Sequence, residues 1–417
     1  MKQALTAALV FFLASVCLSC GGYKAPSNQP TTSTTGVQFR AFVSQDVSSV
    51  FATAGLFLVD AAKDAIVRRP PIQAGSTPGL MALSPNKKLT LVFSASNNSV
   101  TAINNATESS IGSVSLPGPT ESMAVSQDGS TGYAAVSSAP VGGQSPGAVE
   151  VLNLTGGSTI EVAVTSAHYL VASHNANRIL VFSDNADVVT VIAPSNIGSP
   201  SDPRTFVSGF DRPVWGVFSS DDTTAFIMNC GPECGGQIAS VQALDLTQNP
   251  PVAGPALPVP AATIGLLTGS TLYVAGTPPG TACDSSTAAV SCGVLSVVDI
   301  GSMTVTNPNP ILITDGYHKR MGIGSNGQLF VGARTCAEIN SGSEVRGCLS
   351  IFNTANSSVV VPPENGDVTG LEPIANRNVV YVVQGGELRI FNTTTDKLGS
   401  NQIDIAGQAI DVKSIDF

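Results

Sequence analysis

The last nine residues of the chain, Ala409 to Phe417, constrain its fold more than any other stretch. They alternate apolar and polar residues, and the chain then ends. Alternation with a period of two is typical of a β-strand with one buried face. A single terminal strand needs a sheet to join, so we expect it to pair with a sheet formed by an earlier part of the chain.

A weak repeat of roughly 40–55 residues occupies most of the sequence before that strand. Each unit predicts four apolar strands, called A to D here, and Asn, Asp or Gly residues that favour hairpin turns follow strand A, as at Asn326-Gly327. An apolar residue followed by Asn or Asp marks strand C. These pairs are Val59-Asp60, Ile103-Asn104, Leu152-Asn153, Leu244-Asp245, Val298-Asp299, Phe352-Asn353 and Phe391-Asn392.

The first unit lacks a strand A. It has a strand B at Arg40 to Ser44, a strand C at Leu56 to Val59 and a strand D near Ile72. We expect Ile410 to Phe417 to supply the missing strand and to close a ring, which removes an open sheet edge. The sequence therefore predicts an all-β fold, a β-propeller of eight four-stranded blades. Seven blades is the alternative if the divergent fourth unit, around Val191-Ile192-Ala193-Pro194, belongs to a neighbour.

Two of these motifs resemble the YVTN family of β-propeller repeats. They are the segment Gly79 to Asn86, with its later apolar-Asx-Thr step, and Arg40-Ala41-Phe42-Val43-Ser44, which is similar to the Tyr-Val-Thr-Asn strand. The resemblance covers roughly residues 38 to 417 and implies a propeller. Related propellers occur in surface-layer proteins and in lactonases of the 6-phosphogluconolactonase type, but no lactonase catalytic residue can be matched here position by position.

The N-terminus has the pattern of an export signal. Lys2 is followed by an apolar stretch, Ala4 to Val16, that is short for a membrane span. The following Cys17-Leu18-Ser19-Cys20 resembles the lipobox of bacterial lipoproteins, which implies acylation of Cys20. An ordinary cleaved signal peptide is the alternative. Gly21 after the cysteine implies the outer membrane, so we expect an envelope protein attached to the membrane through an N-terminal lipid.

These features divide the chain into three parts. Residues 1–19 are predicted to be the signal peptide and residues 20–36, rich in Pro, Ser, Thr and Asn, a flexible tether. Residues 37–417 are predicted to form a single propeller domain. We expect it to be a monomer.

Six further cysteines form three close pairs in the sequence. An exported protein lies where disulfides persist, and pairing with the near neighbour is the simplest connectivity. Zinc binding is the alternative, but no histidine lies between the paired cysteines. The predicted disulfides join Cys230 to Cys234, Cys283 to Cys292 and Cys336 to Cys348.

All three pairs lie in loops between strands B and C. In a propeller these loops share one face with the loops that precede the A strands, and ligands usually bind on that face. The residues expected there are His168, Asp211, Arg212, Trp215, Tyr317, His318, Lys319 and Arg320. An aromatic residue among a few polar groups is typical of a ligand site. The alternative is that Trp215 packs between blades and that His168 and His318 are surface or channel-mouth residues.

Charge and motifs exclude several functions. The formal net charge of −10 argues against a nucleic-acid partner. No nucleophile elbow, zinc-protease helix or phosphate-binding loop occurs, so the sequence assigns no catalytic residue, no metal and no cofactor. The leading hypothesis is a non-enzymatic binding or scaffold module for an envelope protein or a glycan. The alternatives are a periplasmic, lactonase-like hydrolase that uses the central channel, and a surface structural protein without a small ligand.

Overall fold

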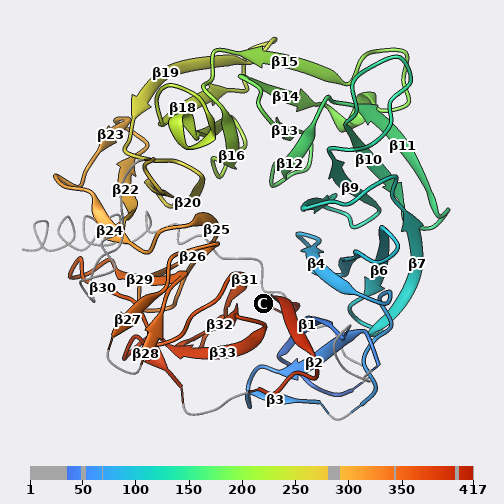
Figure 1. Ribbon diagram of the computed structural model, residues 1–417. Helices are drawn as coiled ribbons and strands as arrows, with labels where there is room; N and C mark the ends of the chain where they lie inside the picture. Colours follow the sequence, from blue (N-terminus) through green and yellow to red (C-terminus); the bar gives the residue numbers. More distant parts are fainter. Residues whose placement is uncertain are drawn as a thin grey trace, which may run out of the picture.

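The computed structural model describes residues 35–47, 53–67, 69–279, 292–341, 344–399 and 403–416. These residues form eight antiparallel sheets of four or five strands, arranged as blades around a central channel, and one separate two-stranded hairpin (Figure 1). The prediction of an eight-bladed propeller is confirmed, and the divergent fourth unit forms a blade of its own. The innermost strand of every blade faces the channel.

Blades 2 to 5 each contain four consecutive strands. Blade 2 comprises β4 (Pro78–Leu83), β5 (Leu89–Ser94), β6 (Ser99–Asn104) and β7 (Ser109–Ser115). Blade 3 comprises β8 (Ser122–Val125), β9 (Thr131–Val136), β10 (Ala148–Asn153) and β11 (Ser158–Ala163). Blade 4 comprises β12 (Ala167–Ala172), β13 (Ile179–Ser183), β14 (Val188–Ile192) and β15 (Arg204–Ser208), and blade 5 comprises β16 (Pro213–Phe218), β17 (Thr224–Asn229), β18 (Ser240–Asp245) and β19 (Val252–Pro258).

Blades 6 to 8 follow the same order with local additions. Blade 6 comprises β20 (Ile264–Thr268), β21 (Thr271–Gly276), β22 (Gly293–Asp299), β23 (Thr304–Val305) and β24 (Ile311–Ile313). Blade 7 comprises β25 (Tyr317–Ile323), β26 (Gln328–Arg334), β29 (Leu349–Asn353) and β30 (Val359–Val360), and a hairpin of β27 (Ile339–Ser341) and β28 (Glu344–Arg346) extends the loop before β29. Blade 8 comprises β31 (Val368–Pro373), β32 (Val379–Gln384), β33 (Glu387–Asn392) and β34 (Lys397–Leu398).

The outer strand of blade 6 is divided into two pieces, β23 and β24, that both pair with β22. Pro308 and Pro310 lie between the pieces and have no backbone N–H for a sheet ladder. The side chain of Asn307 replaces one missing backbone acceptor, because its Oδ1 accepts a hydrogen bond of 2.6 Å from the N–H of Val297.

Blade 1 joins the two ends of the chain. Its sheet order is β3-β2-β1-β35, with β1 at Arg40–Asp46, β2 at Leu56–Asp60, β3 at Ala65–Ile66 and β35 at Gln408–Ser414. The antiparallel register pairs Ala41 with Ser414 and Val43 with Val412. Figure 1 shows the end of the chain beside β1. The C-terminal strand therefore closes the ring, as the alternation in the sequence predicts.

One detail of blade 1 differs from the prediction. The outer strand is β3, whereas Ile72 forms an isolated bridge with Leu56 at the other end of β2. The backbone N–H of each of these two residues donates to the carbonyl of the other, at 2.8 and 2.9 Å. The segment between β2 and blade 2 therefore pairs with β2 twice, and the sequence prediction identified only the second contact.

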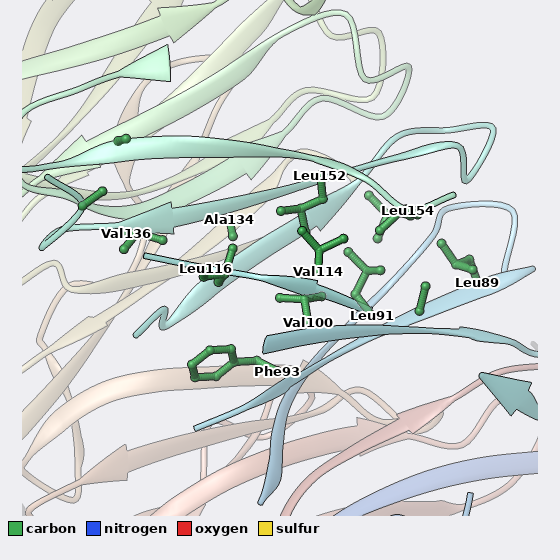
Figure 2. Close-up of a cluster of buried hydrophobic side chains, with 14 residues drawn as sticks. Leu89, Leu91, Phe93, Val100, Val114, Leu116, Ala134, Val136, Leu152 and Leu154 are labelled. Atoms are coloured by element: carbon green, nitrogen blue, oxygen red, sulfur yellow. The ribbon is translucent and has the colours of Figure 1, made fainter. Parts of the chain in front are cut away.

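The hydrophobic core lies between adjacent blades. A second strand such as β5 is buried along its whole length because both faces of its blade are covered, whereas most residues of the outer strand β7 are exposed. Figure 2 shows one such interface, where Leu91 and Val100 of blade 2 lie in the same cluster as Val136 and Leu152 of blade 3. This packing fixes the inner strands, which in turn position the channel residues.

Helical structure is minimal within the described ranges. Two 3-10 turns occur, η1 at Pro194–Asn196 and η2 at Gly231–Cys234. No helix in this part of the chain is both long and apolar enough to cross a membrane.

Candidate functional site

A cavity of about 550 Å³ occupies the channel at the end where the loops before the inner strands gather. Its volume is typical of a small-molecule site. All eight blades contribute residues to its wall. Representative members, from blade 1 to blade 8, are Asp411, Leu80, Glu121, His168, Trp215, Thr263, Lys319 and Thr369.

An ion pair crosses this cavity. Lys319 Nζ on blade 7 contacts Glu121 Oε2, which directly precedes β8 of blade 3. Blades 3 and 7 lie on opposite sides of the ring, as the positions of β9 and β26 show (Figure 1). His168 of blade 4 joins the pair: its Nε2 lies 3.7 Å from Glu121 Oε2, and its Nδ1 lies 3.1 Å from a carboxylate oxygen of Asp184. Three blades thus contribute to one charged network.

The network shifts the pKa values of its members in opposite directions. His168 first and Lys319 second hold the pKa of the Glu121 carboxyl well below its ordinary range, against the opposing effect of burial. The Glu121 and Asp184 carboxylates raise the pKa of His168 above 6.5. Both shifts favour the charged forms. At neutral pH Glu121 is therefore a carboxylate, and the charge of His168 is favoured.

An aromatic pair forms another part of the wall. Tyr169 of blade 4 and Trp215 of blade 5 stack with ring centroids 4.3 Å apart and an interplanar angle of 24°. Trp215 also packs against the hydrophobic clusters on both sides of blade 6, and its Nε1 donates a hydrogen bond of 3.1 Å to the carbonyl of Gly265. It is therefore at once an inter-blade packing residue and a wall residue, and its role in a ligand site stays a prediction.

Two arginines of blade 7 border the cavity without a carboxylate partner. Arg320 Nε donates to the carbonyl of Thr369 at 2.7 Å, and its Nη1 donates to the carbonyl of Lys319 at 3.1 Å. Arg334 forms no ion pair in the described structure, and its Nε is buried without a hydrogen-bond partner. The buried Oγ1 of Thr369 likewise has no partner among the described residues. Unpartnered buried polar atoms are costly, and although others occur elsewhere in the described structure, these two lie at the cavity, where a ligand could satisfy them.

Most of the face predicted from the sequence comes together at this cavity. His168, Arg212, Trp215, Tyr317, His318, Lys319 and Arg320 all belong to its wall. That they form a ligand face stays a prediction.

Asp211 and His318 lie differently from the rest of that set. Asp211 is not part of the wall, because its Oδ2 accepts hydrogen bonds from the backbone N–H groups of Gln237 and Ile238 in a neighbouring loop. His318 borders the cavity but is fully buried, with its Nε2 2.9 Å from the carbonyl oxygen of Thr314. Burial lowers its pKa to about 4, so it is neutral at physiological pH.

The sequence reasoning missed Glu121, Tyr169, Asp184, Arg334 and Thr369. Three of them could have been found, because Glu121, Tyr169 and Thr369 lie just before or near the start of an inner strand, the position from which the predicted set was drawn. Arg334 ends β26 and Asp184 follows β13, so only the folded ring brings them to the cavity.

Two of the predicted disulfides are present, Cys230–Cys234 and Cys336–Cys348, with Cα atoms 5.6 and 5.3 Å apart. In the chain-entropy model each closed loop contributes about 2–3 kcal/mol. Both lie in loops between the second and third strands of their blades, and Cys234 belongs to the cavity wall. The third pair includes Cys283, which lies outside the described residues, as do Cys20 and the predicted signal peptide.

The loop closed by Cys230–Cys234 also carries Glu233. Burial raises its pKa to about 7, although its Oε2 accepts a hydrogen bond of 2.9 Å from the N–H of Thr277, which opposes the shift. Across the described ranges, no group of three or more His, Cys, Asp or Glu side chains has the geometry of a metal site.

The fold and the central cavity place the chain among the eight-bladed β-propellers. No protein-family profile matches the sequence, and no curated protein is a match. Solved structures do match. The dihydro-heme d1 dehydrogenase NirN is similar with a TM-score of 0.63 and 11% identity, over 94% of this chain and 78% of NirN.

Two lactonase-like structures are similar as well. The periplasmic gluconolactonase PpgL of Pseudomonas aeruginosa matches with a TM-score of 0.50 and 15% identity, over 90% of this chain and 98% of its own. A putative 6-phosphogluconolactonase of Bacteroides uniformis matches with a TM-score of 0.51 and 12% identity, over 90% of this chain and 99% of its own. At such identities the similarity establishes the propeller fold, and the likeness to the YVTN family stays a prediction.

Proposed function

We propose that this protein is an exported β-propeller that binds a small molecule in its central cavity. One observation carries the proposal: every blade contributes to a closed wall that combines a stacked aromatic pair with polar atoms that have no partner in the described structure. A concave site of this kind suits a small ligand better than the flat surface of a protein partner. The end of a glycan chain remains a candidate, because a sugar ring can stack on an aromatic face.

An exported location is supported by the two disulfides, since such bonds persist in oxidising compartments. One structurally similar protein is described as periplasmic. Attachment to the outer membrane through an acylated Cys20 and a monomeric state are part of the same proposal. Labelling with a radioactive fatty acid in the native chain and in Cys20→Ala tests the anchor, and equal labelling of both would reject it.

Glu121 is better suited to holding a fixed charge than to acting as a general base. A general base works best when its pKa lies near the working pH, and the pKa of Glu121 is held far below that range.

The fluorescence of Trp215 provides the test, because it is the only tryptophan in the sequence and it borders the cavity. We expect a screen of sugars, sugar acids and aromatic metabolites to find compounds that change its emission saturably. The same compounds should raise the midpoint of thermal unfolding, because a ligand of the native state stabilises it by RT ln(1 + [L]/Kd). If no compound at millimolar concentration changes either signal, the proposal is rejected.

A lactonase-like hydrolase is the second candidate, favoured by the convergence of Glu121, His168 and Asp184 at the mouth of the cavity. It predicts acid release from a panel of sugar lactones, and the double variant Glu121→Gln/His168→Asn should lose that activity. His174→Asn is the matched control, because this exposed histidine lies in the turn between β12 and β13 and pairs with Asp222, which lies between β16 and β17. Activity retained in the double variant would remove this candidate.

A further inference from the structure

We propose that the ligand of the central cavity carries an anionic group, a carboxylate or a phosphate, which is bound by Arg334, Arg320 and the hydroxyl of Thr369. This inference rests on the proposed function and specifies the chemical class of the ligand. These three residues belong to the wall of the cavity, on blades 7 and 8.

Arg334 is the strongest element of this anion site. Most described arginines form ion pairs, as Arg40 does with Asp416 and Arg377 with Asp64. Arg334 has no carboxylate partner in the described structure. Its Nε is buried without a hydrogen-bond acceptor, and although the same is true of Arg69, Arg212, Arg346 and Arg389, each of those four has a carboxylate within 4 Å. A guanidinium cannot lose its proton to avoid this cost, so a missing anion is the simplest partner.

Arg320 and Thr369 complete the same sector. The guanidinium of Arg320 is held by two backbone carbonyls, those of Thr369 and Lys319, and its positive charge has no counterion among the described residues. The seam between the two blades is fixed nearby, because the N–H of Thr335, the residue after Arg334, donates to Asp367 Oδ1 at 2.8 Å. Thr369 Oγ1 then supplies a buried donor without a partner in the described ranges. Fixed donors beside two cations are the geometry that binds a carboxylate or phosphate.

The acidic residues of the wall cannot supply this partner because each is already engaged. Asp411 is buried and its two oxygens accept the backbone N–H groups of Met81 and Val412, at 3.0 and 2.9 Å. Glu121 contacts Lys319, and Asp184 contacts His168. The wall thus keeps unbalanced positive charge in a chain of net charge −10.

The rest of the ligand is indicated by the other side of the cavity. The Tyr169–Trp215 pair of blades 4 and 5 offers a rigid aromatic surface. Stacking on such a surface favours a flat or cyclic body. The cavity therefore suits an organic anion with a ring, and a free inorganic anion would use only part of it.

The experiment compares benzoate and phenyl phosphate with benzamide, their neutral counterpart, in titrations followed by Trp215 emission and by calorimetry. Hydrogen bonds to a charged group contribute about 1.5–3 kcal/mol, so we expect at least one anion to bind about tenfold to hundredfold more tightly than benzamide. The anion that binds more tightly identifies the anionic group of the ligand as a carboxylate or a phosphate. If it is a phosphate, inorganic phosphate should compete for the site.

Arg334→Gln should remove this preference and leave benzamide binding unchanged. The matched control is Arg178→Gln, because Arg178 is outside the cavity wall and, within the described residues, its side chain donates a hydrogen bond only to the carbonyl of Asn177. The preference for anions in the native chain needs no variant, so it holds as a test even if Arg334→Gln fails to fold. Benzamide binding as tightly as both anions, or no binding of any of the three, overturns the inference. The proposed binding of a small molecule is tested separately, by the wider ligand screen.

Discussion

Two charged clusters of this propeller hold distant parts of the chain together, and they differ in whether their arginines have carboxylate partners. The first lies where the ring closes, between blades 1 and 2. Arg40 is fully buried, and its guanidinium contacts Asp416 Oδ1 at 2.6 Å and Glu108 Oε1 at 2.9 Å. Arg69 contacts the other oxygen of Glu108 at 2.6 Å. Each of these four side chains therefore has an opposite charge within 2.9 Å, although the Nε and Nη2 of Arg69 are buried without a hydrogen-bond partner among the described residues.

The second cluster is the wall of the cavity. Its Glu121 is half-exposed, and the buried Nε of Arg334 and Oγ1 of Thr369 have no partner in the described structure. A carboxylate partner makes a buried arginine part of the fold, whereas Arg320 and Arg334 have no carboxylate partner among the described residues and keep their charge for a ligand. The comparison teaches that a countercharge, more than charge itself, separates a structural cluster from a binding site.

The largest effect should come from removing the closing strand. Deletion of Ile410 to Phe417 takes away the inner strand of blade 1 and the Asp416 carboxylate, and leaves β1 with an unpaired edge. We expect the truncated chain to lose its cooperative thermal transition and to aggregate. Scanning calorimetry and light scattering measure both. A truncated protein with the transition of the full chain would show that closure contributes little.

A smaller but still large loss should follow from Asp416→Asn. The change leaves Arg40 buried with reduced pairing, and breaking a buried pair in this way costs about 3–5 kcal/mol. Urea unfolding monitored by circular dichroism measures the difference. Asp202→Asn is the control, because the Asp202–Arg204 pair is solvent-exposed on the Asp202 side and such pairs contribute about 0–1 kcal/mol. Equal losses of unfolding free energy in the two variants would contradict the larger contribution expected of the buried pair.

The smallest effect on stability is expected at the cavity, from Glu121→Gln. Because Glu121 is the main cause of the raised pKa of His168, the variant should lower that pKa towards 6.5. A raised pKa in the folded state contributes stability that is fully present below 6.5 and is lost as the pH rises through the raised value. The variant should therefore weaken the pH dependence of unfolding above pH 6.5. Nuclear magnetic resonance titration of His168 measures the shift, with His174 as an internal reference, and an unchanged His168 pKa would contradict the network.

Much of the fold could be predicted from local patterns. Turn residues such as Asn326-Gly327 and the alternation in Ala409 to Phe417 depend only on neighbours in the sequence, and they placed the inner strands and the closing strand correctly. The position of Trp215 and His168 just before or within inner strands also brought them to the cavity as expected. Arg334 and Asp184 were missed because nothing in their local sequence indicates that they lie at the cavity.

The sequence by itself determined the repeat, favoured eight blades over seven and favoured the two observed disulfide pairs over zinc binding, because each depends on periodicity or on short separations along the chain. Only the tertiary structure decided which charges meet. Glu121 and Lys319 come together across the channel although 198 residues separate them, and Arg40 meets Asp416 across 376 residues. The physical reason is that closure of the ring sets the distances between opposite and adjacent blades. Those distances decide whether a charged side chain reaches a partner of opposite charge or stays available for a ligand.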